Sequence, residues 1–489
     1  MDDDENKLSN HPFEDNINKI KKMLKDCPDI IMRKVNLDEN KSGFFIYIDG
    51  MVNIDLIQRD FVAPLLCLSF EKMQDEETLR NLPVTDLRFT DDLSILIENV
   101  LLGSTVFIGE GLSRAIICGL ISFDKRNIQE PITEKNIKGS HEGFVESIKT
   151  NMTILRRHVR NTNLKFKMFT IGKSTNQMCA VAYIEGIANP DLLKTLCEKI
   201  GDLNFDGFIG VGYIEQFIND HPNSPFPQYQ ATERPDKTTA SLLEGRFAIM
   251  LDGTPVVSIV PTTFFSFFRA VDDFNSNWIF GTFIGSVRIF AALIAIFLPG
   301  LYISILSYHY YTVPLSLLIP LAESRSRVPF PPLIEALLME LTLELLREST
   351  VRLPTFVVNS IGVVGGIIIG QAAVEAGLVS NLMVIVVAIT AIASFVVPNS
   401  DMGLAIRVLR FIVMLFSAAF GVIGIEVTAT TIMAHLVTLE SLGQPYFQPL
   451  IPLKPKDFKD AVIRLHLQTM RKRPDVAQPL DKKRGSGGN

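Results

Sequence analysis

The chain has 489 residues, a net charge of −6 and only 20% charged residues, so no nucleic-acid partner is expected. The charges are unevenly spread: residues 1 to about 275 have the composition of a soluble protein, whereas most of the last third is nearly free of charge. The N-terminal sequence lacks the basic and apolar regions of a signal peptide. Five cysteines, an odd number without CxxC spacing, indicate a reducing compartment and no metal site; they are Cys27, Cys67, Cys118, Cys179 and Cys197.

Two stretches of the soluble part return later in the same order. Residues 47–57 match 183–193, 136 residues later, and residues 103–111 match 245–253, 142 residues later. The first stretch is typical of a strand, an acidic-Gly turn and a helix start capped by Asn. The second is typical of a hairpin strand that ends at Glu-Gly or Asp-Gly. This pattern predicts two related α/β subdomains, with chance similarity of two strand–turn–helix units as the alternative. The predicted subdomains are residues 1–132 and 133–275.

No stretch carries a recognisable catalytic or cofactor-binding motif. Gly109–Gly111 lacks the third glycine and the following helix of a dinucleotide fingerprint, and no GxxxxGK[ST] sequence occurs. The seven histidines are scattered without HExxH spacing. We therefore interpret the glycine-acidic turns as hairpin turns, and we expect no enzyme activity, no cofactor and no metal site.

A proline-stiffened stretch, residues 221–237, is the most unusual soluble segment. Its prolines keep the first part extended, and a helix is predicted over Thr238–Leu243 with Asp236 as its cap. Four charges fall within five residues, namely Glu233, Arg234, Asp236 and Lys237. We interpret the segment as a rigid connector that docks on a neighbouring subdomain or subunit through charge-assisted hydrogen bonds. A solvated loop is the alternative.

The stretch from Thr355 to Ser400 has one charged residue, Glu375, in 46 positions. A helix needs about 20 apolar residues to cross a bilayer, so this stretch has room for two passes with a turn at Gly377–Asn381. Two more spans are predicted at Ile289–Tyr308 and Phe411–Leu439, which makes four.

Two shorter apolar pieces could raise the number of spans to six. Val313–Ala322 is too short to cross a bilayer. Leu333–Leu346 carries Glu335, Glu340 and Glu344, which predicts an interfacial, re-entrant or pore-side helix. The predicted helical membrane domain is residues 276–440, followed by a basic cytoplasmic tail, residues 441–489.

The tail indicates the orientation of the chain. Lys454 to Arg484 has ten Lys or Arg against four Asp or Glu, and basic flanks favour the cytoplasm. We expect both ends to be cytoplasmic, which requires an even number of spans. In a four-span arrangement Arg407 and Arg410 fall outside, which conflicts with the same rule.

A helical projection of residues 356–376 separates two faces. One is a stripe of small residues suited to close helix packing, formed by Gly362, Gly366 and Gly370. The other is the predicted pore face, formed by Val357, Val364, Ile368, Gln371 and Glu375. An apolar band beside a carboxylate is typical of a hydrophobic gate next to a cation-attracting ring, unless Glu375 lies in a surface loop. Glu426 is another intramembrane charge, with Arg407 or Arg410 as its candidate partner.

Several long sequence words resemble the A subunit of GerA-type spore germinant receptors. They are PFPQY at 225–229, ERPD at 233–236, LLEGR at 242–246 and LDGTP at 251–255. Further words extend the resemblance, namely PFP at 329–331, IEALLME at 334–340, ELLRE at 344–348, GQAAVEAG at 370–377 and AIAS at 391–394, whereas the first hundred residues match weakly. The chain departs from the family at Lys138–Ser140, where Arg-Gly-Pro is more frequent.

The resemblance implies a multi-pass protein of the spore inner membrane with a cytosolic, two-part N-terminal domain. It implies a transporter-like B subunit that senses the nutrient, a C lipoprotein, and a homo-oligomeric ring, a pentamer, that passes cations when a germinant is sensed. Two other functions stay open. One is a secondary transporter, because Pro299-Gly300 and Val313–Ala322 resemble broken helices. The other is a membrane scaffold of the germination machinery, including the related stage V sporulation A-type protein.

Overall fold

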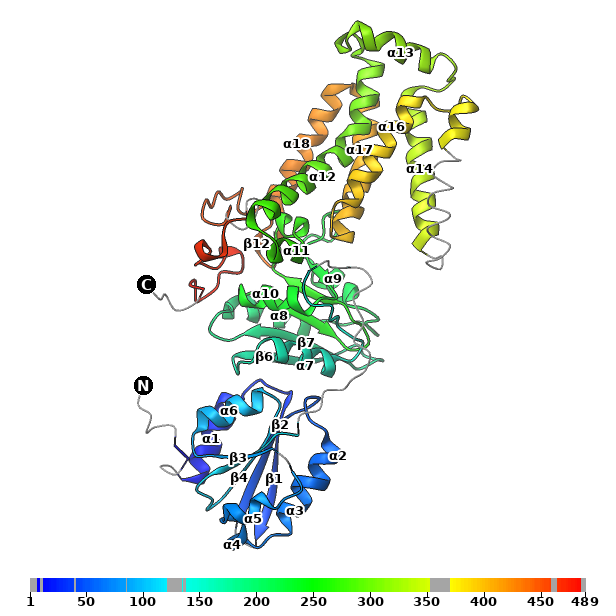
Figure 1. Cartoon of the computed structure of the whole chain (residues 1–489). Helices are drawn as coiled ribbons and strands as arrows, with labels where there is room; N and C mark the ends of the chain where they lie inside the picture. The colour runs from blue at the N-terminus through cyan, green and yellow to red at the C-terminus, as the bar shows by residue number, and fades with distance from the viewer. Residues whose placement is uncertain are drawn as a thin grey trace. The chain divides into compact units, whose positions relative to one another are not determined.

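The computed structural model describes residues 7–8, 12–38, 41–84, 86–120, 134, 138–351, 370–458 and 464–484. The chain forms two compact units (Figure 1). The α/β unit comprises Met1–Asp220, Tyr229–Pro261 and Arg471–Asn489. The helical unit comprises His221–Gln228 and Thr262–Met470. The α/β region and the helical region predicted from the sequence are therefore both present.

The first sheet of the α/β unit has the order β1-β2-β4-β5-β3, and all its neighbouring strands are antiparallel. Its strands are β1 (Ile30–Asp38), β2 (Lys41–Ile48), β3 (Leu87–Thr90), β4 (Thr105–Gly109) and β5 (Ala115–Cys118). Its helices are α1 (Phe13–Met23), α2 (Ile54–Leu56), α3 (Ala63–Leu66), α4 (Phe70–Met73), α5 (Glu76–Arg80) and α6 (Leu93–Leu101), with a π-helical turn at Ile57–Val62.

Both faces of this sheet are covered by helices. Successive strand residues point to opposite sides, so neighbouring residues belong to different cores. Ile46 and Val106 pack in one core with α1 and α6. Their neighbours Phe45 and Phe107 pack in a second core with the segments between α2 and α5. Figure 1 shows these two groups of helices on opposite faces of the sheet. The inner strands β4 and β5 are buried along their whole length, whereas the edge strands β1 and β3 carry charged residues.

The second sheet repeats the same order, β6-β7-β9-β10-β8, again with antiparallel neighbours. Its strands are β6 (Leu164–Ile171), β7 (Gln177–Ile184), β8 (Gln230–Thr232), β9 (Phe247–Leu251) and β10 (Val257–Val260). Its helices are α7 (Ile148–His158), α8 (Pro190–Gly201), α9 (Val211–Ile218) and α10 (Pro235–Leu243).

The repeated sequence words occupy the same places in the two sheets. Tyr47 lies in β2 and Tyr183 in β7, the second strand of each order. Gly111 and Gly253 follow β4 and β9, the third strands, with φ of +82° and +90°. A positive φ favours glycine at both turns. The origin of the two halves by duplication and the subdomain boundaries stay predictions.

The last described segment of the chain belongs to the α/β unit, which differs from the free basic tail predicted over residues 441–489. Arg473 Nε donates to Leu243 O at 2.8 Å, and Arg484 Nη2 donates to Glu244 Oε1 at 2.8 Å. The Leu480 amide donates to Ile187 O at 2.9 Å. Residues 471–484, which we call the C-terminal clasp, are held because their arginines and backbone find these acceptors.

The described part of the helical unit consists mainly of helices. These are α11 (Val271–Asn275), α12 (Trp278–Ser307), α13 (Leu315–Arg325), α14 (Pro332–Val351), α16 (Asn381–Phe395), α17 (Ser400–Phe420) and α18 (Val422–Thr438). Shorter elements are the 3-10 turns at Phe264–Phe268, Tyr310–Thr312, Leu467–Thr469 and Asp475–Ala477, the last in the clasp, and the hairpin of β11 (Glu440–Ser441) and β12 (Gln444–Pro445).

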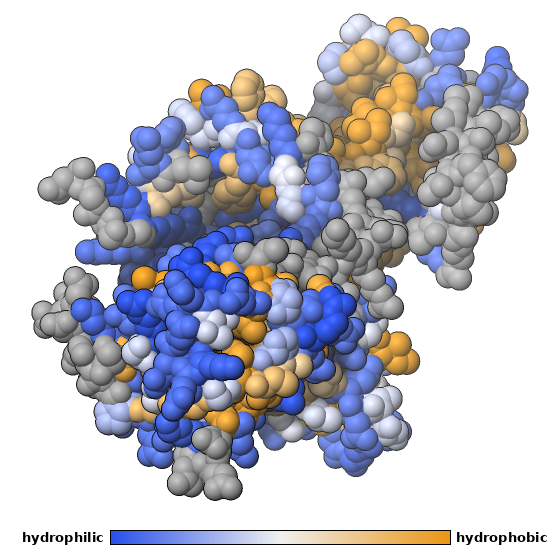
Figure 2. Space-filling model, turned by 60° about the horizontal axis from the view of Figure 1, so that its bottom comes forward, coloured by the Kyte–Doolittle hydropathy of each residue, from blue (hydrophilic) through white to orange (hydrophobic). Residues whose placement is uncertain are grey.

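Among the described residues, α12 and α17 are long and apolar enough to cross a membrane. The apolar helices α16 and α18 have 15 and 17 residues. The predicted count of four to six spans is therefore not confirmed. Figure 2 shows apolar side chains gathered on the helical unit, whereas the visible face of the α/β unit is mostly hydrophilic.

Two predicted membrane segments differ in the structure. The span predicted over Phe411–Leu439 is broken at Gly421, whose φ of +63° ends α17 and starts α18. The span predicted over Ile289–Tyr308 begins earlier, at Trp278, and α12 continues through Pro299 instead of breaking there. Arg407 and Arg410 lie within α17, where they pair with carboxylates of α14, and the side of the membrane that they face stays a prediction.

Candidate functional site

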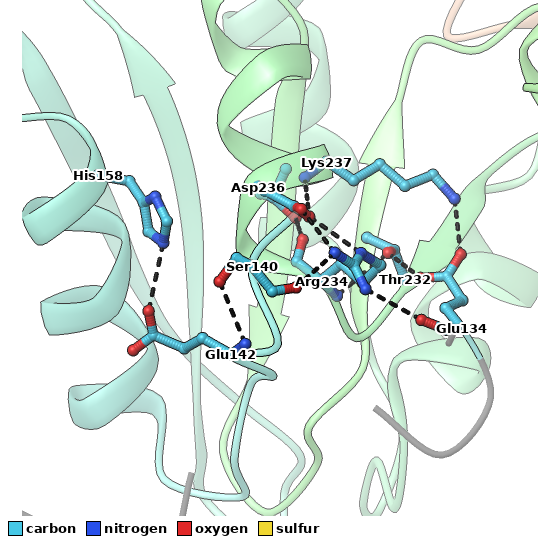
Figure 3. Close-up of polar contacts among 9 residues, drawn as sticks. Glu134, Ser140, Glu142, His158, Thr232, Arg234, Asp236 and Lys237 are labelled. Atoms are coloured by element: carbon cyan, nitrogen blue, oxygen red, sulfur yellow. Dashed lines mark hydrogen bonds and ion pairs between the residues drawn. The ribbon is translucent and has the colours of Figure 1, made fainter. Parts of the chain in front are cut away.

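The charged part of the connector, Glu233–Lys237, belongs to the α/β unit and centres on Arg234 (Figure 3), whereas its first part, His221–Gln228, belongs to the helical unit. Helix α10 begins at Pro235, a residue whose fixed φ suits the first helical position. Arg234, directly before it, is 1% exposed. Its Nε and Nη2 donate to the two carboxylate oxygens of Asp236 at 3.1 and 2.6 Å. Nη1 donates to Glu134 O at 3.1 Å, and Nη2 also donates to Ser140 O at 2.8 Å.

Lys237 and Glu134 extend this network. Lys237 Nζ donates to Glu134 Oε1 at 2.7 Å, and Thr232 donates to the other oxygen of that carboxylate. The carbonyl oxygen of Glu233 accepts from the Phe144 amide at 2.8 Å. The connector is therefore an ordered junction between the chain around residues 134–144 and the start of α10.

One detail of the sequence prediction is corrected. Asp236 does not cap the helix, because α10 begins three residues earlier than predicted and Asp236 lies in its first turn, accepting from the Lys237 amide at 2.7 Å. Arg234 bonds a carboxylate and two backbone carbonyls of the α/β unit, and docking of the segment on a neighbouring subdomain or subunit stays a prediction. The sequence signal, four charges on a stiff segment, indicated a bonded arginine but not the partners.

A second ionic group, also drawn in Figure 3, surrounds Glu142. His158 Nε2 lies 3.4 Å from Glu142 Oε2, and Arg157 Nη1 donates to Oε1 at 2.9 Å. The hydrogen bond from His158, together with the charge of Arg157, lowers the pKa of the Glu142 carboxyl below its usual value. Both partners come from the end of α7, whose basic last turn suits the negative end of the helix dipole.

The predicted pore residues are only partly described. Val357, Gly362, Val364, Gly366 and Ile368 lie outside the described residues. Residues 370–375 are helical, and Gln371 Nε2 donates to Glu375 Oε1 at 2.9 Å with both side chains exposed. Gly370 is buried, and a Cβ there would lie 3.7 Å from Val384 of α16, an ordinary contact.

Glu426 is exposed on α18. Its predicted partners are bonded elsewhere: Arg407 Nη1 donates to Glu344 Oε2 at 2.7 Å, and Arg410 pairs with Glu340. These α14–α17 ion pairs are functional candidates that sequence reasoning missed. The sequence showed four glutamates on one apolar helix and two arginines on another, but it did not indicate which of them would meet.

In the described part of the chain, no three metal-binding side chains come together. Burial raises the pKa of the Cys118 and Cys179 thiols to about 12, so neither is a thiolate at neutral pH. The polar groups described above therefore interact through ion pairs and hydrogen bonds.

The fold defines the class, a protein with an α/β unit and a helical unit in which two of the described helices are long and apolar enough to cross a membrane. More particularly, the chain belongs to the Bacillus/Clostridium GerA spore germination protein family, which matches residues 18–476.

Similar proteins cover most of the chain. The uncharacterized membrane protein YfkQ of Bacillus subtilis (strain 168) is 36% identical over 476 residues, which cover 97% of this chain and 93% of that protein. Spore germination protein KA of the same organism is 37% identical over 476 residues, 96% of this chain and 87% of that protein. Among solved structures, the chain is similar to the N-terminal domain of the A subunit of the Bacillus megaterium spore germinant receptor GerK3, known from a crystal structure. The two are 27% identical with a TM-score of 0.38, and the match covers 53% of this chain and 97% of the GerK3 chain.

Proposed function

We propose that this chain is the A subunit of a nutrient germinant receptor in the spore inner membrane, and that copies of it surround a germinant-gated cation path. Family membership over residues 18–476 and the germination role in the name of a relative support the receptor part. The observation that carries the cation path is the exposed carboxylate of Glu375, in a stretch that is otherwise uncharged.

An intramembrane carboxylate is costly and is a functional candidate by default. The hydrogen bond from Gln371 orients the Glu375 carboxylate on the exposed side of residues 370–375. If several copies form a ring, these carboxylates form an acidic ring, which attracts cations. Val357, Val364 and Ile368 precede Glu375 in the sequence and are the proposed apolar gate, which closes by excluding water. Gly362, Gly366 and Gly370 are the proposed contacts between helices.

The connections of the helical unit support an even number of membrane crossings. The chain enters this unit after Pro261 and leaves it at Met470, and both flanking segments belong to the α/β unit. A soluble unit lies on one side of a membrane, so the two ends of the helical unit lie on that same side. We propose that this side is the cytoplasm, because basic residues dominate the segment from Lys454 to Arg484.

The partners are proposed from the family resemblance. They are a transporter-like B subunit that senses the nutrient, a C lipoprotein, and further copies of this chain in a pentameric ring. A secondary transporter needs discontinuous helices at its midplane, and α12 is continuous through Pro299. A passive scaffold would give the Glu375 carboxylate no role.

Cation selectivity of the reconstituted receptor tests the proposal. Glu375→Gln removes the fixed charge and keeps the shape, so we expect a lower preference for cations over anions with unchanged assembly. Glu426→Gln is the matched control, since Glu426 is also an exposed carboxylate on an apolar helix. Reversal potentials in liposomes or planar bilayers give the preference directly. If only Glu426→Gln changed it, the path would run along α18 instead.

A further inference from the structure

Arg410 is the central residue of α17, which has 21 residues. At about 1.5 Å per residue, its Cα lies roughly 15 Å from either end of the helix. If α17 crosses a bilayer, this arginine lies near the middle of the hydrocarbon core. Its side chain is 2% exposed, so protein surrounds it, and lipid does not reach it.

The guanidinium group of Arg410 joins three helices. Its Nη1 pairs with Glu340 of α14, whose side chain is fully buried. Its Nε donates to Ala295 O of α12 at 2.8 Å. Ala295 is four residues before Pro299, and proline has no N–H to donate to the carbonyl at that position. Arg410 thus supplies the donor that Pro299 removes from α12.

The pair is surrounded by further charges on the same helix faces. Arg407 donates to Glu344 at 2.7 Å, and Arg347 Nη1 lies 3.6 Å from the other oxygen of Glu344. Arg347 Nη2 also donates to Ser394 Oγ of α16 at 2.9 Å. Among the described residues, Glu340 Oε1 and Arg410 Nη2 have no protein partner.

A buried ion pair contributes little net stability, because removing two charges from water costs about as much as their attraction returns. Its best-attested use is to fix one packing arrangement against others. Arg410 bonds both Glu340 and the Ala295 carbonyl, which has no partner within α12 because Pro299 lacks an N–H. These two bonds together fix the position of α12 relative to α14 and α17. Stability alone does not account for that combination.

We propose that Arg410 is a positioning residue that latches α12, α14 and α17 together in the resting state of the receptor, and that activation requires this latch to loosen. The resting-state part rests on the function proposed above, whereas the three-helix contact does not. The latch is distinct from the Glu375 site because it sets when the path opens rather than which ions pass.

Two substitutions test the latch from opposite sides. Arg410→Gln removes the charge, and Pro299→Ala returns an N–H to Ala295 O without touching any charge, which frees Nε of Arg410. The matched control is Pro320→Ala, because Pro320 also lies inside a helix of this unit, α13. Resting cation leak from liposomes without germinant is one measurement. Hydrogen exchange of Pro332–Val351 in the full chain is the other.

We expect Arg410→Gln to raise the resting leak about tenfold, the equivalent of about 1.4 kcal/mol, and to speed exchange in α14. Pro299→Ala is expected to raise the resting leak and to speed exchange in α14, each by less than Arg410→Gln does. Pro320→Ala is expected to match the wild type in both measurements. The latch would be overturned if Pro299→Ala showed the same leak and the same exchange as the wild type, and if Arg410→Gln only reduced the amount of folded protein. If the wild type never conducts, the proposed function fails, and the exchange measurement still decides whether Arg410 holds α14.

Discussion

At the scale of single residues, Arg234 is a demanding position of the α/β unit, because its guanidinium group is buried. A fully buried guanidinium must have its donors satisfied, and here a carboxylate and two backbone carbonyls accept from it. Removing one partner of such a group leaves the others buried and unpaired.

We therefore expect Arg234→Ala to lower the free energy of unfolding by about 3 kcal/mol. Arg160→Ala is the control, because Arg160 is an exposed arginine of the same subdomain and should change stability by no more than about 0.5 kcal/mol. Urea unfolding of the purified chain, followed in the α/β unit, gives both values. Equal stability of the two variants would contradict this expectation and would favour the alternative interpretation of the connector as a solvated loop.

Glu142 gives a prediction for pH. Its folded pKa is lowered, so the carboxylate contributes stability that is present above the unfolded pKa of about 4.3 and is lost as the pH falls through the folded pKa. Acidification below about pH 4.3 should therefore destabilise the wild type more steeply than Glu142→Gln. Melting temperatures of both proteins between neutral and acid pH test this. Parallel curves would contradict it.

At the scale of elements, the turn between α17 and α18 depends on two glycines. Gly421 has a φ of +63°, which ends one helix and reverses the chain. Gly424, one turn later, lies so close to α17 that a Cβ would be 2.0 Å from Phe416 O. A side chain at this position must push the two helices apart.

Gly424→Ala should thus cost about 1–3 kcal/mol of stability through overpacking. The contrasting variant is Gly403→Ala in α17, where nothing lies within 4 Å of the added Cβ. That change should stabilise the helix by about 0.5–1 kcal/mol, since alanine loses less backbone freedom than glycine. Thermal unfolding in detergent compares them, and a tolerated Gly424→Ala would mean that α18 packs differently.

The helical unit also shows what the sequence can and cannot predict. A turn was predicted at Gly377–Asn381, and Gly377 has a φ of +69° just before α16 begins at Asn381. The break at Gly421 was missed, because glycine within an apolar run is ordinary in membrane helices. The glutamates of α14 indicated an interfacial, re-entrant or pore-side helix, since the arginines that pair with Glu340 and Glu344 lie more than 60 residues away in the sequence.

At the scale of the whole molecule, the sequence indicated an α/β region before an apolar helical region, because composition and periodicity are local properties. It did not indicate that the α/β unit is discontinuous. Membership of the clasp in that unit depends on Arg473 and Arg484 finding acceptors about 240 residues earlier. Long-range contacts of this kind leave no periodic pattern in a single sequence.

The clasp leads to a prediction of membrane topology. Protease sites placed before Phe13 and after Arg484 should be cleaved from the same side of sealed inverted vesicles, because both flank described parts of one soluble unit. A site in the turn at Tyr310–Thr312, after α12, should be cleaved only from the opposite side. Cleavage of the two terminal sites from opposite sides would rule out an even number of crossings.

The central claim is that copies of this chain form a cation path that a germinant opens. Planar-bilayer recording of the receptor, purified with its B and C partners, tests it most directly, using a panel of amino acids, sugars and nucleosides as triggers. We predict cation-selective current steps after at least one trigger and a closed baseline before it. Saturable, substrate-coupled flux without current steps, or no current with any trigger that germinates the spores, would contradict the claim.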